Sequence, residues 1–222
     1  MSNTVWFLTS NQGKLSEAEH HLKQIGYSVR QLIVDQELIY EPQAENLVTV
    51  AKSKISQAMN FIPSDFSDGD MILVEDAGLF VDALQGFPGV YSSFVHSTIG
   101  NAGMLRLLSH LNSADPVSSA NLRSAHFKAI AALWKNDEVI IGEGICPGHI
   151  SLDAMEGNGF GYDPIFIPYD LDAELNPLTP GNYGEFSTHG KTFGGVGSEI
   201  KQKFSHRTKA LIDLFNQMPS AS

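Results

Sequence analysis

Two adjacent carboxylates, Glu75 and Asp76, come directly after the apolar run Met71–Val74. The run is short, aliphatic and bounded by charge, which predicts a buried strand that stops at the two acids. Gly78 and the turn sequence Gly86–Gly89 follow them. Open α/β sheets place their chemistry where buried strands end, and carboxylates at such a place can bind a metal ion or accept a proton. An isolated Glu-Asp pair more often caps a turn, so the pattern needs support from other parts of the chain.

The polar loop Ser10–Lys14 contains groups that suit a phosphate. It follows the β-branched and aromatic run Thr4–Thr9, which predicts a buried strand, and it precedes a helical pattern that ends at Gly26. A strand, a Gly-containing loop with a lysine and a helix together offer backbone N–H groups and a positive helix end to an anion. The spacing of a Walker A loop is absent, and such a loop is by itself more often a plain connection.

A third set of groups lies in the segment Gly157–Pro164, which combines closely spaced glycines with Phe160, Tyr162 and Asp163. Glycines let the backbone approach a ligand closely. Exposed aromatic rings can stack on a flat heterocycle. Loops that mix glycine with aromatic residues are common, so this segment alone is weak evidence for a base-binding site.

The elements that must position these groups alternate between strand and helix patterns. Further strands are predicted over Tyr27–Val34, Ala125–Trp134 and Val139–Ile145, the last two as an antiparallel hairpin. The segment 169–191 is polar and rich in Pro and Gly, and it is expected to be a flexible surface loop that covers the ligand. We find no internal repeat and no linker, so a single domain over 1–222 is predicted. Helices are predicted from four apolar stripes: Leu15, Ala18, Leu22 and Ile25; Val48, Ala51, Ile55, Ala58 and Ile62, stopped by Pro63; Met104, Leu107, Leu108 and Leu111; and, from Thr208 onward, Leu211, Leu214, Phe215 and Met218.

The composition is that of an ordinary globular protein, with 222 residues, 42% hydrophobic and 18% charged. A net charge of -11 would repel a nucleic-acid polymer or an anionic membrane, whereas a small polyphosphate could bind with a divalent cation. The single cysteine, Cys146, excludes an internal disulfide framework and suits a reducing compartment. Neither a signal peptide nor an apolar run of about 20 residues is visible, so a cytoplasmic location is expected.

Taken together, the motifs resemble the inosine triphosphate pyrophosphatase family, and they follow the family's order from Thr9 to Leu211. Single motifs are weak, but six in register are unlikely to arise by chance. The matching segments are Thr9–Lys14 for T-x-N-x-x-K; Glu41-Pro42-Gln43 for E-x-Q, with Lys54 after it; Glu75–Leu79 for E-D-S-G-L; Gly86–Ser92 for G-x-P-G-x-Y-S; Gly159–Pro164 for G-F-G-Y-D-P; and Thr192-Phe193, Glu199, Lys201 and Ser205-His206-Arg207 for the closing T-F…E-x-K…S-H-R.

The resemblance implies an α/β fold with a mixed central sheet flanked by helices, in two lobes with the active-site cleft between them. It implies a homodimer that hydrolyses non-standard purine nucleoside triphosphates to the monophosphate and pyrophosphate with Mg²⁺. Asp76 would be both general base and metal ligand, Glu41 the second metal ligand, and Glu75 a possible partner of that site. The substrate-binding residues would be Thr9, Ser10, Asn11, Gln12, Gly13, Lys14, Lys54 and Ala77 for the phosphates, and Phe160, Gly161, Tyr162, Asp163, Lys201, His206 and Arg207 for the purine.

The chain departs from the family pattern at several positions. Ala77 replaces a serine that touches the triphosphate, the segment Ser92–Val95 lacks the usual basic residue, and Gly194–Val196 replaces A-E-M. The loop before Thr192 is also long. Two alternatives therefore stay open. One is a related Maf-type pyrophosphatase that acts on other nucleotides, against which the intact G-F-G-Y-D-P and S-H-R motifs argue. The other is a nucleotide-binding regulator with weakened catalysis.

Overall fold

The computed structural model describes residues 3–155, 157 and 159–218. The chain divides into two compact units. Unit 1 comprises Met1–Ala77, Ala129–Gly144 and Arg207–Ser222, and unit 2 comprises Gly78–Lys128 and Ile145–His206. Each unit has its own hydrophobic core and is described separately below.

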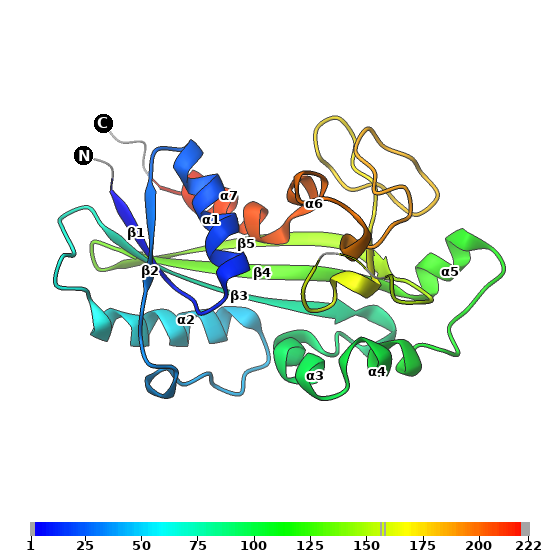
Figure 1. Ribbon diagram of the computed structural model, residues 1–222, viewed down its shortest axis with the longest axis horizontal. Coiled ribbons are helices and arrows are strands. Elements are labelled where there is room, and N and C mark those ends of the chain that lie inside the picture. The colour runs from blue at the N-terminus through cyan, green and yellow to red at the C-terminus, as the bar shows by residue number, and fades with distance from the viewer. Residues whose placement is uncertain (1–2, 156, 158, 219–222) are drawn as a thin grey trace. The chain divides into compact units, whose positions relative to one another are not determined.

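A six-stranded sheet has the order β2-β1-β3-β4-β5-β6 (Figure 1). β1 pairs in parallel with β2 and β3, whereas β5 and β6 are antiparallel, so the sheet is mixed. The predicted hairpin is confirmed in a longer form, with Asn136 and Asp137 at φ 49° and 63° in its turn. The strands are β1 (Thr4–Leu8), β2 (Ser28–Leu32), β3 (Met71–Val81), β4 (Ser124–Lys135), β5 (Glu138–Ile150) and β6 (Phe166–Pro168).

In unit 1, helices cover both faces of the sheet. The helices α1 (Gln12–Gln24) and α7 (His206–Asn216) lie on one side and α2 (Leu47–Ala58) lies on the other (Figure 1). Alternate strand residues point to opposite faces, so the continuous apolar runs of β1, β3 and β4 serve both layers. One core cluster unites α1 and α7 with the odd-numbered positions Val5, Phe7, Met71, Leu73, Ala129, Ala131 and Leu133.

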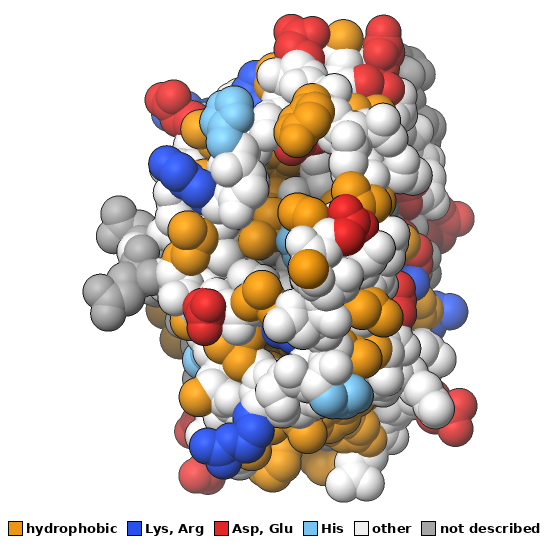
Figure 2. Space-filling view, turned by 90° about the vertical axis from the view of Figure 1, so that its right-hand side faces the viewer, with side chains coloured by type: hydrophobic (Ala, Val, Ile, Leu, Met, Phe, Trp, Pro, Cys, Tyr) orange, Lys and Arg blue, Asp and Glu red, His pale blue; other side chains and the backbone are white. Residues whose placement is uncertain are grey.

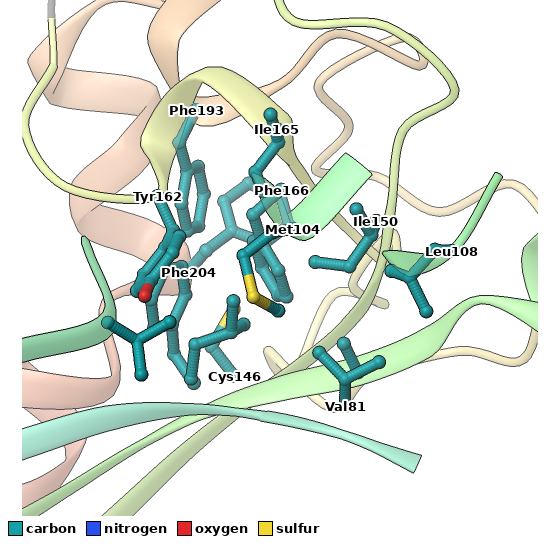
Figure 3. Close-up of a cluster of buried hydrophobic side chains, with 14 of the residues drawn as sticks. Val81, Met104, Leu108, Cys146, Ile150, Tyr162, Ile165, Phe166, Phe193 and Phe204 are labelled. Carbon is teal, nitrogen blue, oxygen red and sulfur yellow. The ribbon is translucent and has the colours of Figure 1, made fainter. Parts of the chain in front are cut away.

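Unit 2 has a core rich in aromatic residues (Figure 3). The rings of Phe127 and Phe166 lie 4.5 Å apart, and Phe193 lies 5.4 Å from Phe166. Hydrophobic side chains are also exposed, among polar and charged side chains and backbone, on the face seen from the α5 side of Figure 1 (Figure 2). The helices of unit 2 are α3 (Ser92–Thr98), α4 (Gly100–Leu107), α5 (Pro116–Leu122) and α6 (Ser198–Phe204).

Arg123 is a buried cation in unit 2, with 2% of its surface exposed. Its guanidinium donates to the carbonyl oxygens of Leu108 at 2.6 Å, Ile150 at 2.8 Å and Ser151 at 2.7 Å. The backbone N–H of Ser151 in turn donates to the Ile165 carbonyl at 2.8 Å. A buried charge is tolerated only when its donors are satisfied. Arg123 thus ties the end of α4 to the segments on both sides of the Gly-rich loop.

Most predicted elements are confirmed, but the end of the central strand is wrong. β3 runs to Val81, so Glu75 and Asp76 lie within the strand and not at its end. The residues after them are apolar or small and can continue the strand. A Cβ atom at Gly78 would lie 2.3 Å from the Gly89 carbonyl oxygen, so glycine is required there for a close backbone approach. Three residues of the predicted apolar stripes, Ile25, Ile62 and Leu107, are 45%, 46% and 43% exposed. Ile25 and Ile62 lie beyond the ends of their helices, and Leu107 is the last residue of its helix.

The segment 169–191 is mostly irregular, as expected, but hydrogen bonds organise it. Asp170 accepts from the Ser187 hydroxyl at 2.7 Å and from the Gly184 N–H at 3.2 Å. Leu171 and Phe186 exchange backbone hydrogen bonds at 2.9 and 3.1 Å. Flexibility of this segment and its role as a cover stay predictions. Across the described ranges, every helix is too short or too polar to cross a bilayer.

Candidate active site

The loop between β1 and α1 has the form expected of an anion-binding turn. Asn11 is the N-cap of α1, and its side-chain oxygen accepts from the Lys14 N–H at 3.2 Å. The Thr9 hydroxyl accepts from the Asn11 N–H at 3.1 Å and holds the start of the turn. The first turn of a helix carries backbone N–H groups without partners in the helix and a partial positive charge. Thr9 and Asn11 thus shape the loop, while its backbone and Lys14 are the groups available to a phosphate.

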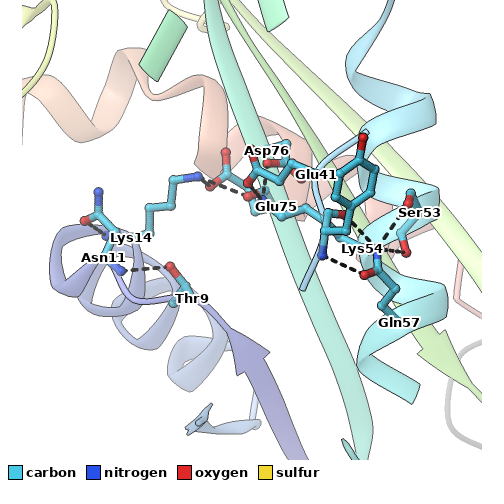
Figure 4. A network of polar contacts seen from close by, with 10 residues as sticks. Thr9, Asn11, Lys14, Glu41, Ser53, Lys54, Gln57, Glu75 and Asp76 are labelled. Carbon is cyan, nitrogen blue, oxygen red and sulfur yellow. Dashed lines mark hydrogen bonds and ion pairs between the residues drawn. The ribbon is translucent and has the colours of Figure 1, made fainter. Parts of the chain in front are cut away.

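The carboxylates Glu75 and Asp76 face opposite sides of β3, because neighbouring side chains alternate along a strand. Glu75 contacts Lys14 of α1, whereas Asp76 contacts Lys54 of α2 (Figure 4). These helices lie on opposite faces of the sheet. The two acids therefore form ion pairs with different lysines and do not converge on one metal ion.

Glu75 is a buried anion surrounded by cations. Its side chain is 3% exposed, and its Oε2 atom lies 2.9 Å from Lys14 Nζ and 3.6 Å from Arg207 Nε. Lys14 Nζ also donates to the Glu75 carbonyl oxygen at 3.0 Å. Burial opposes the negative charge, but Lys14, Arg207 and Lys54 outweigh it and hold the pKa of Glu75 below its ordinary value. Glu75 is thus ionised at neutral pH and fixes the position of Lys14.

Asp76 shares one cation with Glu41. Lys54 Nζ donates to Asp76 Oδ1 at 2.7 Å and to Glu41 Oε1. Burial raises the pKa of Asp76 even though Lys54 and Lys14 favour its charged form. Burial also disfavours the charge on Lys54, but Asp76 and Glu41 reverse this effect and raise the pKa of Lys54. Asp76 is therefore an acid with a raised affinity for a proton, next to a permanent positive charge.

The same carboxylates suit a magnesium ion. Glu41 and Asp76 both reach a single cation, and Asp76 Oδ2 is buried with no hydrogen-bond partner among the described residues. Mg²⁺ prefers hard oxygen ligands and keeps several waters, so one or two carboxylates are sufficient. Within the part of the chain that the structure describes, no group of three or more His, Cys, Asp or Glu side chains could enclose a metal. The donor set thus fits a hydrated Mg²⁺ ion better than a closed structural metal site.

In unit 2, Phe160 presents an exposed ring beside a lysine. Phe160 is 40% exposed, and Lys201 Nζ lies 4.8 Å from the centroid of the Phe160 ring. Asp163 accepts from Lys201 Nζ at 2.6 Å and from the Phe160 N–H at 3.0 Å. Gly161 has φ 63°, a conformation that favours glycine. Asp163 thus holds both the aromatic loop and Lys201.

Tyr162 is an anchor of this loop. It is 4% exposed, and its hydroxyl donates to the Ser92 carbonyl oxygen at 2.9 Å. Burial raises the pKa of Tyr162 to about 12. The Ser92 hydroxyl accepts from the Leu79 N–H at 2.8 Å and donates to the Gly89 carbonyl at 2.7 Å. Ser92 was not among the predicted site residues, although its place at the end of the G-x-P-G-x-Y-S motif was a signal for it.

The neighbours His206 and Arg207 have different surroundings. His206, in unit 2, is 4% exposed and stacks on Phe127 with ring centroids 4.9 Å apart. Arg207, in unit 1, lies 3.6 Å from Glu17 as well as from Glu75. The sequence motifs predict that both act with Lys201 on the base, and they give no sign of Glu17. Ala77 packs against the core cluster of unit 1, and as an alanine it has no hydroxyl group to offer a phosphate.

Comparisons with known proteins agree with this description. The model of the Ham1 family matches residues 5–217. The chain is 35% identical over 210 residues to the dITP/XTP pyrophosphatase of Thermococcus kodakarensis, covering 95% of this chain and 94% of that protein. It is also 35% identical over 211 residues to the dITP/XTP pyrophosphatase of Pyrococcus horikoshii, covering 95% of this chain and 94% of that protein.

Solved structures show the same fold. The nucleoside-triphosphatase / dITP/XTP pyrophosphatase of Mycobacterium abscessus matches with a TM-score of 0.63 and 27% identity, covering 97% of this chain and 100% of that one. A HAM1 protein from Coxiella burnetii matches with a TM-score of 0.67 and 24% identity, covering 97% of this chain and 98% of that one.

Proposed function

This chain belongs to the Ham1 family, and on that premise we propose that it hydrolyses non-standard purine nucleoside triphosphates. The substrates would be dITP, ITP and XTP, which the names of its relatives and the motifs of the sequence favour. The bond broken lies between the α- and β-phosphates, so the products are the nucleoside monophosphate and pyrophosphate.

The phosphates would bind to unit 1. The first turn of α1 offers backbone N–H groups, and Lys14 and Lys54 offer ammonium groups. Charge-assisted hydrogen bonds of this kind are the strong contacts that proteins make with phosphate oxygens. Both lysines are paired with carboxylates in this structure, and an ammonium group has three N–H donors, so Lys14 would contact a phosphate oxygen while Glu75 still holds it.

Asp76 would accept the proton of the attacking water. Its raised pKa makes it a stronger base once it is ionised, and Lys54 beside it favours the ionised form. Glu41 and Asp76 would hold a magnesium ion, which when bound would screen the charge of the triphosphate and make the water more acidic. Glu75 would act indirectly, by fixing Lys14 on the other face of β3.

The purine would bind to unit 2. Phe160 would stack on the ring, with Gly161 and Asp163 shaping the loop around it. Lys201 and His206 are donors that suit the 6-keto oxygen and N7 of hypoxanthine and xanthine. Arg207, which belongs to unit 1, is assigned the same role by the family resemblance alone. Adenine has an amino group at this position, which is itself a donor, so it would leave buried donors without acceptors.

Three further expectations belong to the same proposal. The protein would act as a single functional domain over 1–222, as a homodimer and in the cytoplasm. The acidic charge of -11 supports a small-molecule substrate over a nucleic-acid polymer or an anionic membrane.

The observation that carries the proposal is the convergence of Asp76, Glu41 and Lys54 within a Ham1-family chain. The test is a pyrophosphate-release assay with Mg²⁺ over a panel of dITP, ITP, XTP, ATP, GTP and pyrimidine triphosphates. We expect fast release from the first three only. Orthophosphate as the first product would place the cleavage elsewhere, preference for pyrimidine or modified bases would favour a Maf-type enzyme, and no turnover of any nucleotide would favour a binding regulator.

A further inference from the structure

The ammonium group of Lys54 lies between the two carboxylates that suit a metal ion. Its Nζ atom donates to Asp76 Oδ1 at 2.7 Å and to Glu41 Oε1. These are the negatively charged oxygens that Mg²⁺ prefers. The side chains of Lys54 and Asp76 are only 16% and 12% exposed, so water screens their contact weakly. Lys54 and a divalent cation therefore need the same two carboxylates.

We propose that Lys54 competes with the divalent cation for Glu41 and Asp76, and that the triphosphate relieves this competition by drawing Lys54 onto its own oxygens. The inference rests on the proposed function. The Lys54 ammonium group and a metal ion bound to the same carboxylate would be close enough to repel each other strongly. Phosphate oxygens are good alternative acceptors for an ammonium group. The free protein would thus bind the metal weakly, and metal and nucleotide would each strengthen the binding of the other.

The surroundings of Lys54 allow such a movement. Lysine carries its charge on a flexible stem of four carbons, and Lys54 extends from α2, a helix anchored by buried residues such as Ile55. Glu41 has a side chain that is 63% exposed and lies in an irregular segment before α2. Asp76, by contrast, is held in β3. Lys14 contacts Glu75 on the other face of the strand, so it does not replace Lys54 at Asp76.

The test measures metal affinity without turnover. Mn²⁺ is used as the probe, and free Mn²⁺ is followed by electron paramagnetic resonance in the absence of nucleotide. Lys54→Met keeps the length of the side chain and removes its charge, and we expect Mn²⁺ to bind about tenfold more tightly, or about 1.4 kcal/mol. Lys52→Met is the matched control, because Lys52 is exposed on the same helix and its loss changes the net charge equally. This control should bind Mn²⁺ as the wild type does.

Two further measurements test whether the tighter Mn²⁺ binding of Lys54→Met takes place at Glu41 and Asp76. Adding Glu41→Gln to Lys54→Met should return the affinity toward the wild-type value. A non-hydrolysable α,β-methylene analogue of ITP, with free Mn²⁺ corrected for chelation, should tighten Mn²⁺ binding in the wild type and much less in Lys54→Met. Lys54→Gln carries the same expectation if Lys54→Met does not fold.

The proposal is overturned if Mn²⁺ binds to the Lys54 variants no more tightly than to Lys52→Met, or if the gain survives Glu41→Gln. Because no hydrolysis takes place, either result is independent of the substrate proposal. Failure of the proposed function would instead be seen as absence of pyrophosphate release by the wild-type protein with Mg²⁺.

Discussion

Replacing Asp76 by Asn should separate activity from stability. Asn has nearly the same size, and its side-chain oxygen can still accept from Lys54 Nζ, which lies 2.7 Å from Asp76 Oδ1. The change removes a metal ligand and the group that accepts the proton. Losing a general base costs about 10²–10⁴ in rate. We therefore expect kcat with dITP to fall by at least about a hundredfold, which is about 2.7 kcal/mol of transition-state stabilisation.

Unlike activity, the free energy of unfolding should change little in Asp76→Asn, or should increase. Burial raises the pKa of Asp76, so the folded protein holds this proton more tightly than the unfolded chain does. The stability contributed by such a group is present at low pH and is lost as the pH rises through the folded-state pKa. Ionised Asp76 is thus a cost at neutral pH, partly offset by Lys54. The net change should lie within about 1 kcal/mol, or about 2–4 °C in Tm for a protein of this size.

The assay combines steady-state pyrophosphate release, thermal unfolding and a pH profile. In the wild type, kcat/KM should fall toward acid pH as Asp76 takes up a proton, at a pH above the ordinary value of 3.8 for an aspartate. This acid limb should be absent from the residual activity of Asp76→Asn. Asp65→Asn is a surface control, since Asp65 pairs with Arg30 and is 59% exposed. Near-normal turnover in Asp76→Asn would refute the assignment, and a large fall in Tm would show that Asp76 serves the fold instead.

Three further predictions concern other parts of the site. Glu41→Gln should lower activity at ordinary Mg²⁺ concentrations and regain part of it at high Mg²⁺, measured by titration of the rate with Mg²⁺; a deficit that Mg²⁺ does not change would argue against a metal ligand. Tyr162→Phe removes the hydroxyl that donates to the buried Ser92 carbonyl at 2.9 Å, so the free energy of unfolding should fall by about 1–3 kcal/mol. KM should rise alike for ITP and XTP, and a rise in KM for only one of them would mean that the hydroxyl contacts the substrate. If Arg207 recognises the base, Arg207→Ala should lower the ratio of kcat/KM for ITP to kcat/KM for ATP by about one to two decades. Equal losses of kcat/KM on both nucleotides would instead show that Arg207 holds Glu75, its ion-pair partner at 3.6 Å.

The predicted mobility of the segment 169–191 can be tested by limited proteolysis. Cleavage there should slow when a non-hydrolysable ITP analogue is bound, if the segment covers the nucleotide. Equal rates of cleavage with and without the analogue, measured by mass spectrometry of the fragments, would contradict the idea of a cover.

The sequence predicted the strands and long helices well, because their apolar patterns are strong and have clear ends. Short helices were missed, for example α5 (Pro116–Leu122), which has too few residues to show a period. Its start was nevertheless visible, since Asp115 caps the helix and Pro116 occupies its first turn. The extension of β3 through two acids was not predictable from local pattern, because charged residues normally end a buried strand. Ion pairs with Lys14 and Lys54, distant in sequence, make it possible.

The candidate site shows the same division between local and long-range information. The Gly-rich loop and the cap of α1 are local motifs, and the sequence located them. The partners of Arg207 and the anchor of Tyr162 on Ser92 depend on contacts between segments far apart in the chain; Tyr162 and Ser92 are separated by 70 positions. Spacing along the chain carries no information about such pairs.

The alternation of Glu75 and Asp76 along β3 has a consequence for how the sequence can change in length. The register of β3 is fixed by pairing with β1, with Val5 opposite Met71 and Phe7 opposite Leu73. Deleting one residue between Met71 and the acids would keep the residue types nearly unchanged, yet it would turn Asp76 toward Lys14 and Glu75 toward Lys54. A change in the number of residues between the start of β3 and the acids is therefore expected to preserve the two ion pairs only if that number changes by two.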